Sequence, residues 1–80
     1  MPTALREGPY RFLFFSADCT EPAHMHVQRD RLVAKIWLHD LSFADTGGFS
    51  AKELARILAI VRAHRHELQE RWNEHCQGYR

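Results

Sequence analysis

Cysteine is scarce in this chain, which contains only Cys19 and Cys76 among its 80 residues. The two lie far apart in the sequence, and neither belongs to a spacing typical of metal ligands. A fold of this size that depends on disulfides needs more pairs and an oxidising compartment, and the sequence gives no sign of either. It therefore does not predict a disulfide. Cys19 lacks the cationic sequence neighbours that would make it a reactive thiolate.

Long apolar runs and an excess of one charge are also missing. Eleven Lys and Arg residues balance ten Asp and Glu residues, leaving a net charge of +1, so no overall field draws the chain to nucleic acid. No apolar run approaches membrane-spanning length, and the N-terminus lacks the apolar core of a signal peptide. With 45% hydrophobic and 26% charged residues, the composition is that of one folded domain. We therefore expect a cytoplasmic protein with no membrane association.

Histidine is the residue present in excess, with six copies. His24 and His26 follow Pro22 at the start of an apolar, strand-like run. In an extended strand, side chains at positions i and i+2 point to the same face. We therefore expect the two imidazoles to lie side by side, with Met25 and Val27 on the opposite face.

The pattern along the chain predicts a single α+β domain over residues 1–80. A small, mostly antiparallel sheet of three or four strands is expected over about 3–38, a loop over about 39–49, and one long helix over about 50–76 that covers one face of the sheet. The strand segments are apolar or aromatic runs bounded by turn signals: residues 3–7, 10–16, 24–28 and 32–38. The expected core comprises Leu5, Phe12, Phe14, Val27, Ile36, Leu38, Leu54, Leu58, Val61, Leu68 and Trp72.

Ser50 and Glu53 match a capping box at the start of the helix, and Gly78 is a stop signal at its end. A straight helix of this length spans about 39 Å, more than the diameter of so small a globule, so it must overhang or bend. We expect an overhanging end, with Trp72 and Tyr79, to form an interaction surface for a partner chain.

One side of the helix carries an apolar stripe, and Arg65 falls near its middle at 100° per residue. A buried guanidinium must be paired or hydrated, and Asp18, Glu21 and the histidine strand offer partners. Alternatively, the stem of Arg65 packs on the stripe while its head reaches water.

Three segments resemble a small bacterial family catalogued as domain of unknown function number 4160. They are Pro2-Thr3, Glu21-Pro22-Ala23-His24-Met25-His26-Val27, and His64-Arg65-His66-Glu67-Leu68 followed by Trp72. The resemblance covers nearly the whole chain except residues 40–48, which match poorly. It implies a protein partner, because members are reported beside a second small protein in an arrangement that looks like a toxin–antitoxin pair. The positions it carries over are His24, His26, His64, Arg65, Glu67 and Trp72.

A ribonuclease that needs no metal is one interpretation of these residues. His24 and His26 would act as general acid and base, because imidazole titrates near neutral pH, and Arg65 would stabilise charge on the phosphate. A metal site is a second interpretation: His24 and His26 would hold Zn²⁺, with Asp18, Cys19, Glu21 or His64 completing the shell.

The interpretation that we favour is interaction, in which the histidines hold the helix to the sheet and the chain works through a partner. That partner is a small protein, a second copy of the chain, or both, and RNA is the partner in the ribonuclease alternative. Simple structural roles for the histidines also remain open. The favoured function is thus one component of a toxin–antitoxin-like pair.

Overall fold

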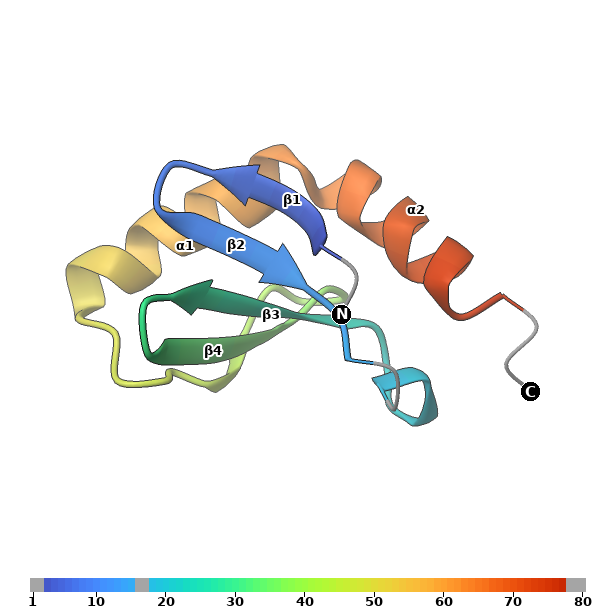
Figure 1. Cartoon of the computed structure of the whole chain (residues 1–80), viewed down its shortest axis with the longest axis horizontal. Coiled ribbons are helices and arrows are strands. Elements are labelled where there is room, and N and C mark those ends of the chain that lie inside the picture. The colour runs from blue at the N-terminus through green and yellow to red at the C-terminus, as the bar shows by residue number, and fades with distance from the viewer. Residues whose placement is uncertain (1–2, 16–17, 78–80) are drawn as a thin grey trace.

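The computed structural model describes residues 3–15 and 18–77, which form one sheet with two α-helices packed against it (Figure 1). The elements in chain order are β1 (Thr3–Glu7), β2 (Tyr10–Leu13), the short 3₁₀ helix η1 (Asp18–Thr20), β3 (His24–Arg29), β4 (Leu32–Trp37), β5 (Phe43–Asp45), α1 (Ala51–Ala63) and α2 (Arg65–His75). All neighbouring strands pair antiparallel, in the order β1-β2-β3-β4-β5. The α+β class and the antiparallel sheet are confirmed, whereas the number of strands and the single helix are wrong.

The fifth strand lies inside the segment that the sequence predicts as a loop. β5 pairs with β4 through Lys35↔Asp45 and Ile36↔Phe43, with an irregularity between these two pairs. Three residues are too few to show the alternation by which a strand is recognised. The chain then turns at Gly47, which has φ +63° and lies so close to the backbone of Val33 that any β-carbon would collide with it. Only glycine, which has no β-carbon, fits at this turn.

The long helix of the prediction is two helices that meet at His64. The backbone there has φ −111° and ψ 17°, far from the helical ψ of about −42°. The apolar stripe has a gap at this turn, because His64 and Arg65 occupy it between Val61 and Leu68. A bend lets both Val61 and Leu68 become fully buried. Of the two expected alternatives, overhang or bend, the chain bends. No helix among the described residues has the length and apolar character needed to cross a membrane.

The strand register sorts side chains onto two faces. Phe12, Val27 and Ala34 lie side by side across three strands, and Met25 faces Ile36. All five are fully buried, and together with the buried side of the helices they form the core. α1 runs behind β1 and β2 in Figure 1, on this core side.

We call the opposite side of the sheet the open face. Its central rows are formed by Arg11, Gln28 and Val33, and by Leu13, His26 and Lys35. Most of these side chains are half-buried or exposed. Alternation thus assigns the residues of β3 to the two faces as predicted, with Met25 and Val27 opposite the histidines.

Candidate functional site

The histidine pair lies at the start of β3, as the spacing predicts. The ring centres of His24 and His26 are 5.1 Å apart, with the rings nearly perpendicular. Trp37 faces His24 across the β3–β4 pairing, and their ring centres are 5.5 Å apart. Trp72 of α2 packs on the same imidazole at 5.0 Å. The pair is therefore part of an aromatic cluster that joins sheet to helix.

His24 is fully buried in this cluster. Its Nδ1 lies 2.8 Å from the carbonyl oxygen of Pro22. A carbonyl can only accept, so this bond places a proton on Nδ1 of His24. The bond also ties the imidazole to the turn that precedes β3. A ring held in this way, with no surface exposed to solvent, is suited to fixing the end of the strand rather than to meeting a substrate.

His26 is less enclosed, being partly buried. Phe15 packs edge-on against its ring, with 4.4 Å between ring centres. Beside it, the ammonium of Lys35 lies 4.6 Å from the ring centre of Trp37 and pairs with the carboxylate of Glu21. Glu21, one of the candidate metal ligands and Arg65 partners, is thus in a surface ion pair with Lys35.

Arg65 does not occupy the buried position that a straight helix predicts. It is exposed, and its Nη2 donates to the carbonyl oxygen of His39 at 2.6 Å. Leu68 and Trp72 keep the buried places that the stripe predicts. Arg65 directly follows the break between α1 and α2, and its guanidinium is bound by the carbonyl of His39 at the surface instead. The side chain of Asp18, the other predicted partner, lies outside the described residues.

His64 lies apart from the aromatic cluster, between two carboxylates. Its Nε2 is 3.3 Å from Oε1 of Glu7 on β1, and its Nδ1 is 3.3 Å from Oε1 of Glu67 on α2. These contacts hold the helix bend beside the edge strand. Glu67, which the family resemblance carries over, thus contacts the helix bend.

The structure describes only one of the two predicted interaction residues, Trp72 and Tyr79. Trp72 is only 7% exposed and packs on Phe14, with 5.6 Å between ring centres. Its expected place in the core is confirmed, whereas its expected exposure at an overhanging helix end is wrong, because the bend turns the stripe back onto the sheet. Tyr79 lies outside the described residues.

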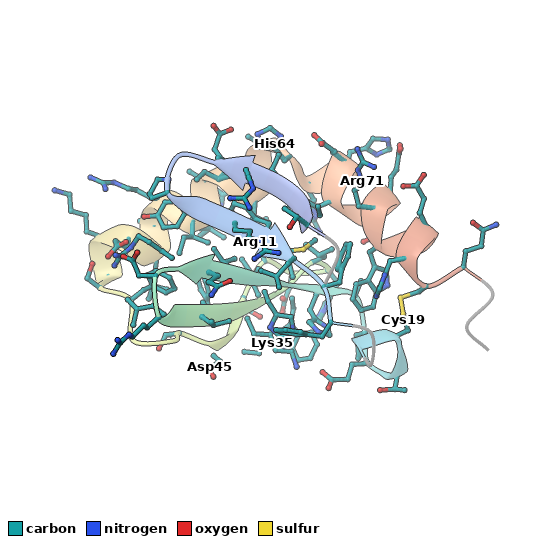
Figure 2. The ribbon with its side chains drawn as sticks, in the orientation of Figure 1. Arg11, Cys19, Lys35, Asp45, His64 and Arg71 are labelled. Atoms are coloured by element: carbon teal, nitrogen blue, oxygen red, sulfur yellow. A yellow bond between two sulfur atoms is a disulfide. The ribbon has the colours of Figure 1, made fainter. Side chains whose placement is uncertain are left out.

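Cys19 and Cys76 are joined in a disulfide, which the sequence did not predict. Figure 2 shows the bond between η1 and the C-terminal end of α2. The bend at His64 brings this end of α2 to the loop that precedes β3. Local sequence patterns cannot predict such a contact between distant residues. The same place holds His75, and one ligand atom from each of these three residues lies within 4.8 Å of the others. Among the described residues, this is the group of three whose ligand atoms converge, and it does not include the histidine pair.

Sequence reasoning also missed an ion pair that joins β3 to α1. The guanidinium of Arg29 donates from Nε to Oε2 of Glu53 at 2.7 Å and from Nη2 to Oε1 at 2.8 Å. Tyr10 donates its hydroxyl to the same carboxylate at 3.0 Å. Ser50 accepts from the backbone N–H of Glu53 at 3.2 Å, which confirms the predicted cap. The carboxylate, however, turns to the sheet.

The carboxylate of Glu53 is expected to make the free energy of unfolding depend on pH in the acid range. The hydrogen bonds from Arg29, and less strongly the one from Tyr10, hold the pKa of Glu53 below its usual value despite partial burial. When the pKa of a carboxyl group is lower in the folded state than in the unfolded state, its ionised form stabilises the fold. This stabilisation is fully present at pH values above the unfolded-state pKa, about 4.3 for glutamate, and is lost as the pH falls through the folded-state pKa. We expect acid to lower the urea midpoint of the wild type more than that of the Glu53→Gln variant.

Urea unfolding at neutral pH and at about pH 3, below the usual glutamate pKa, measures this difference. Glu74→Gln on α2 is the matched control, since Glu74 is exposed and lies 3.8 Å from Arg71. An acid response of Glu53→Gln equal to that of the wild type would contradict the assignment.

Comparison with known proteins identifies the family. The family described as Domain of unknown function (DUF4160) matches residues 10–73. The chain belongs to the DUF4160 family. The match runs from β2 through the histidine pair to Trp72, so the aromatic cluster lies within the DUF4160 region, and Cys76 lies just beyond it. No curated protein and no solved structure matches the chain.

Proposed function

We propose that the chain acts by binding an acidic protein partner on the open face of its sheet, as one component of a toxin–antitoxin-like pair. The observation that carries this proposal is the contrast between the two faces. α1 covers one face. The other face is covered by Trp72 of α2 at His24. Away from that contact, Arg6, Arg11 and Val33 are exposed or partly exposed to solvent.

The chemistry of the open face suits a protein surface. Arg6 and Arg11 are cross-strand neighbours there, and Nε of Arg11 donates to Oγ1 of Thr3 at 2.8 Å, which orients the guanidinium. Val33, in the same row as Arg11, is 37% exposed and is the large apolar side chain exposed among the described residues. Arginine and apolar side chains together are typical of protein interfaces. In Figure 2, Arg11 lies over β2 and Lys35 over β4.

A protein partner is favoured over RNA by charge. Nucleic-acid binding depends on many Lys and Arg contacts to phosphates, whereas the net charge of the chain is +1 and Lys35 is already paired with Glu21. Complementary charge steers two proteins together with only a few such groups. The burial of His24 and the hydrogen bond of Arg65 to His39 also favour binding over the ribonuclease chemistry, which needs accessible groups.

The test uses the second small protein encoded beside the gene, the arrangement that the family resemblance implies. We expect the two proteins to form a complex, and Arg11→Glu to weaken it at least tenfold, about 1.4 kcal/mol, because a carboxylate would face an acidic surface. The matched control is Arg71→Glu, which reverses a charge on an exposed residue of α2 and should change the dissociation constant less than twofold. Isothermal titration calorimetry gives both values.

Three results would overturn the proposal. The first is the absence of a complex with the neighbouring protein, and the second is an equal loss in both variants, which would place the interface elsewhere. The third is RNA cleavage by the chain that disappears in His24→Ala/His26→Ala, which would establish the ribonuclease instead. Light scattering of the chain alone distinguishes a second copy from a different partner on the same face.

A further inference from the structure

We propose that Cys19, His75 and Cys76 form a redox-switched zinc site, which binds Zn²⁺ when the cysteines are thiols and loses it when they form the disulfide. The three ligand atoms lie within 4.8 Å of one another, and all three residues are half-buried. An ion can therefore reach them, while the surrounding protein still holds them in place. This site is separate from the histidine pair and does not depend on the proposed function.

The ligand set identifies the metal. Two thiolates and one imidazole are soft to borderline donors, which select zinc over magnesium or calcium. Thiolates bound to one tetrahedral zinc lie about 3.8 Å apart, given Zn–S bonds of about 2.3 Å. The disulfide shows that both sulfurs reach the same place from η1 and α2. After reduction, rotation of the two cysteine side chains can move the sulfurs apart to the distance that zinc requires.

His75 is oriented for this role by its surroundings. Its Nε2 lies 3.3 Å from the carbonyl oxygen of Phe15, and its ring stacks on Phe14 with 4.9 Å between ring centres. A metal-bound histidine commonly donates its second nitrogen to a backbone carbonyl, which fixes the tautomer. The carbonyl of Phe15 would thus hold the proton on Nε2 and leave Nδ1 for the metal. The fourth position of the tetrahedron is left for water.

The switch balances as two steps. A dithiol reductant supplies two electrons and two protons, breaks the Cys19–Cys76 bond and becomes a cyclic disulfide. Zinc then binds both sulfurs and displaces their two protons. A two-electron oxidant such as hydrogen peroxide takes the electrons of the two thiolates and two protons from solvent, is reduced to two water molecules, re-forms the disulfide and releases the ion. The end of α2 is therefore tied to η1 in both states, covalently in one and through the metal in the other.

Metal titration of the full chain tests this. Reduced protein, freed of reductant, is titrated with Co²⁺ and then with Zn²⁺. We expect one equivalent of cobalt to give thiolate-to-cobalt absorption that zinc abolishes, and the oxidised protein to show none. His75→Phe keeps an aromatic ring on Phe14 but removes the nitrogen ligand. It should weaken zinc binding at least tenfold, since even the loss of an outer-shell partner costs about 10- to 100-fold.

The matched control is His66→Phe, which changes a histidine of the same helix whose side chain is 91% exposed. Its zinc affinity should stay within twofold of the wild type. The proposal is overturned if reduced wild type takes up no metal, or if His75→Phe binds as well as His66→Phe. It is also overturned if zinc shifts the NMR signals of His24 and His26 rather than those of His75. Circular dichroism of the oxidised His75→Phe protein confirms that a loss of binding is not a loss of fold.

Discussion

Removing the Cys19–Cys76 disulfide is expected to lower the free energy of unfolding by about 4 kcal/mol. The bond joins residues 57 positions apart, and the chain-entropy relation for a loop of that length gives this figure. A domain of this size has a total stability on the order of 5–15 kcal/mol, so the loss is a large fraction of the whole. Urea unfolding of oxidised wild type and of C19S/C76S, in a zinc-free buffer, measures it.

Reduced wild type with a chelator is the control for the serine variant. The two should unfold at the same urea concentration, because both lack the cross-link and the metal. A difference of less than about 1 kcal/mol between oxidised and reduced wild type, well below the usual range for native disulfides, would contradict the prediction.

Trp72→Ala is expected to destabilise the fold by about 3–5 kcal/mol. Trp72 is 7% exposed, and its ring packs on Phe14, which follows β2, and on the imidazole of His24. Truncation removes a large buried surface and leaves a cavity that these rings cannot close without moving. The loss also frees the end of α2 from the sheet.

Trp37→Ala is the matched comparison for Trp72→Ala. Trp37 also packs on His24, but it is half-buried and lies on the open face, under Lys35. Its truncation should therefore cost less than half as much, since less surface returns to water. Urea unfolding followed by far-ultraviolet circular dichroism gives both values without relying on tryptophan emission. Equal costs would show that Trp72 does not hold α2 to the sheet.

Period-two alternation predicted the best-defined part of the site. His24 and His26 share a face because the strand is regular, and the register needs only their spacing. The same rule placed Met25 and Val27 in the core, where both are fully buried. Strand β5 escaped prediction because its three residues are too few to show an alternating pattern.

Features that depend on distant residues escaped sequence reasoning. Arg65 was placed on a buried stripe by adding 100° per residue through His64. The same projection holds for Leu68 and Trp72. Arg65, however, is exposed and bound by the carbonyl of His39, 26 positions away. Glu53 fitted a local cap, yet its carboxylate is bound by Arg29, 24 positions away. Cys19 and Cys76 meet only because the helix bends. In each case a tertiary contact decides the outcome, and local pattern carries no information about it.

The order of the strands in the sheet has a consequence for how the chain folds. Each strand pairs with its immediate neighbour in the sequence, so every pairing closes a short loop, which favours rapid folding. The Cys19–Cys76 contact is the opposite case, since it requires α2 to have docked along the finished sheet. Oxidation of this pair is thus expected to follow folding rather than guide it, and the fraction of disulfide formed at any moment would report how many chains have completed their tertiary structure.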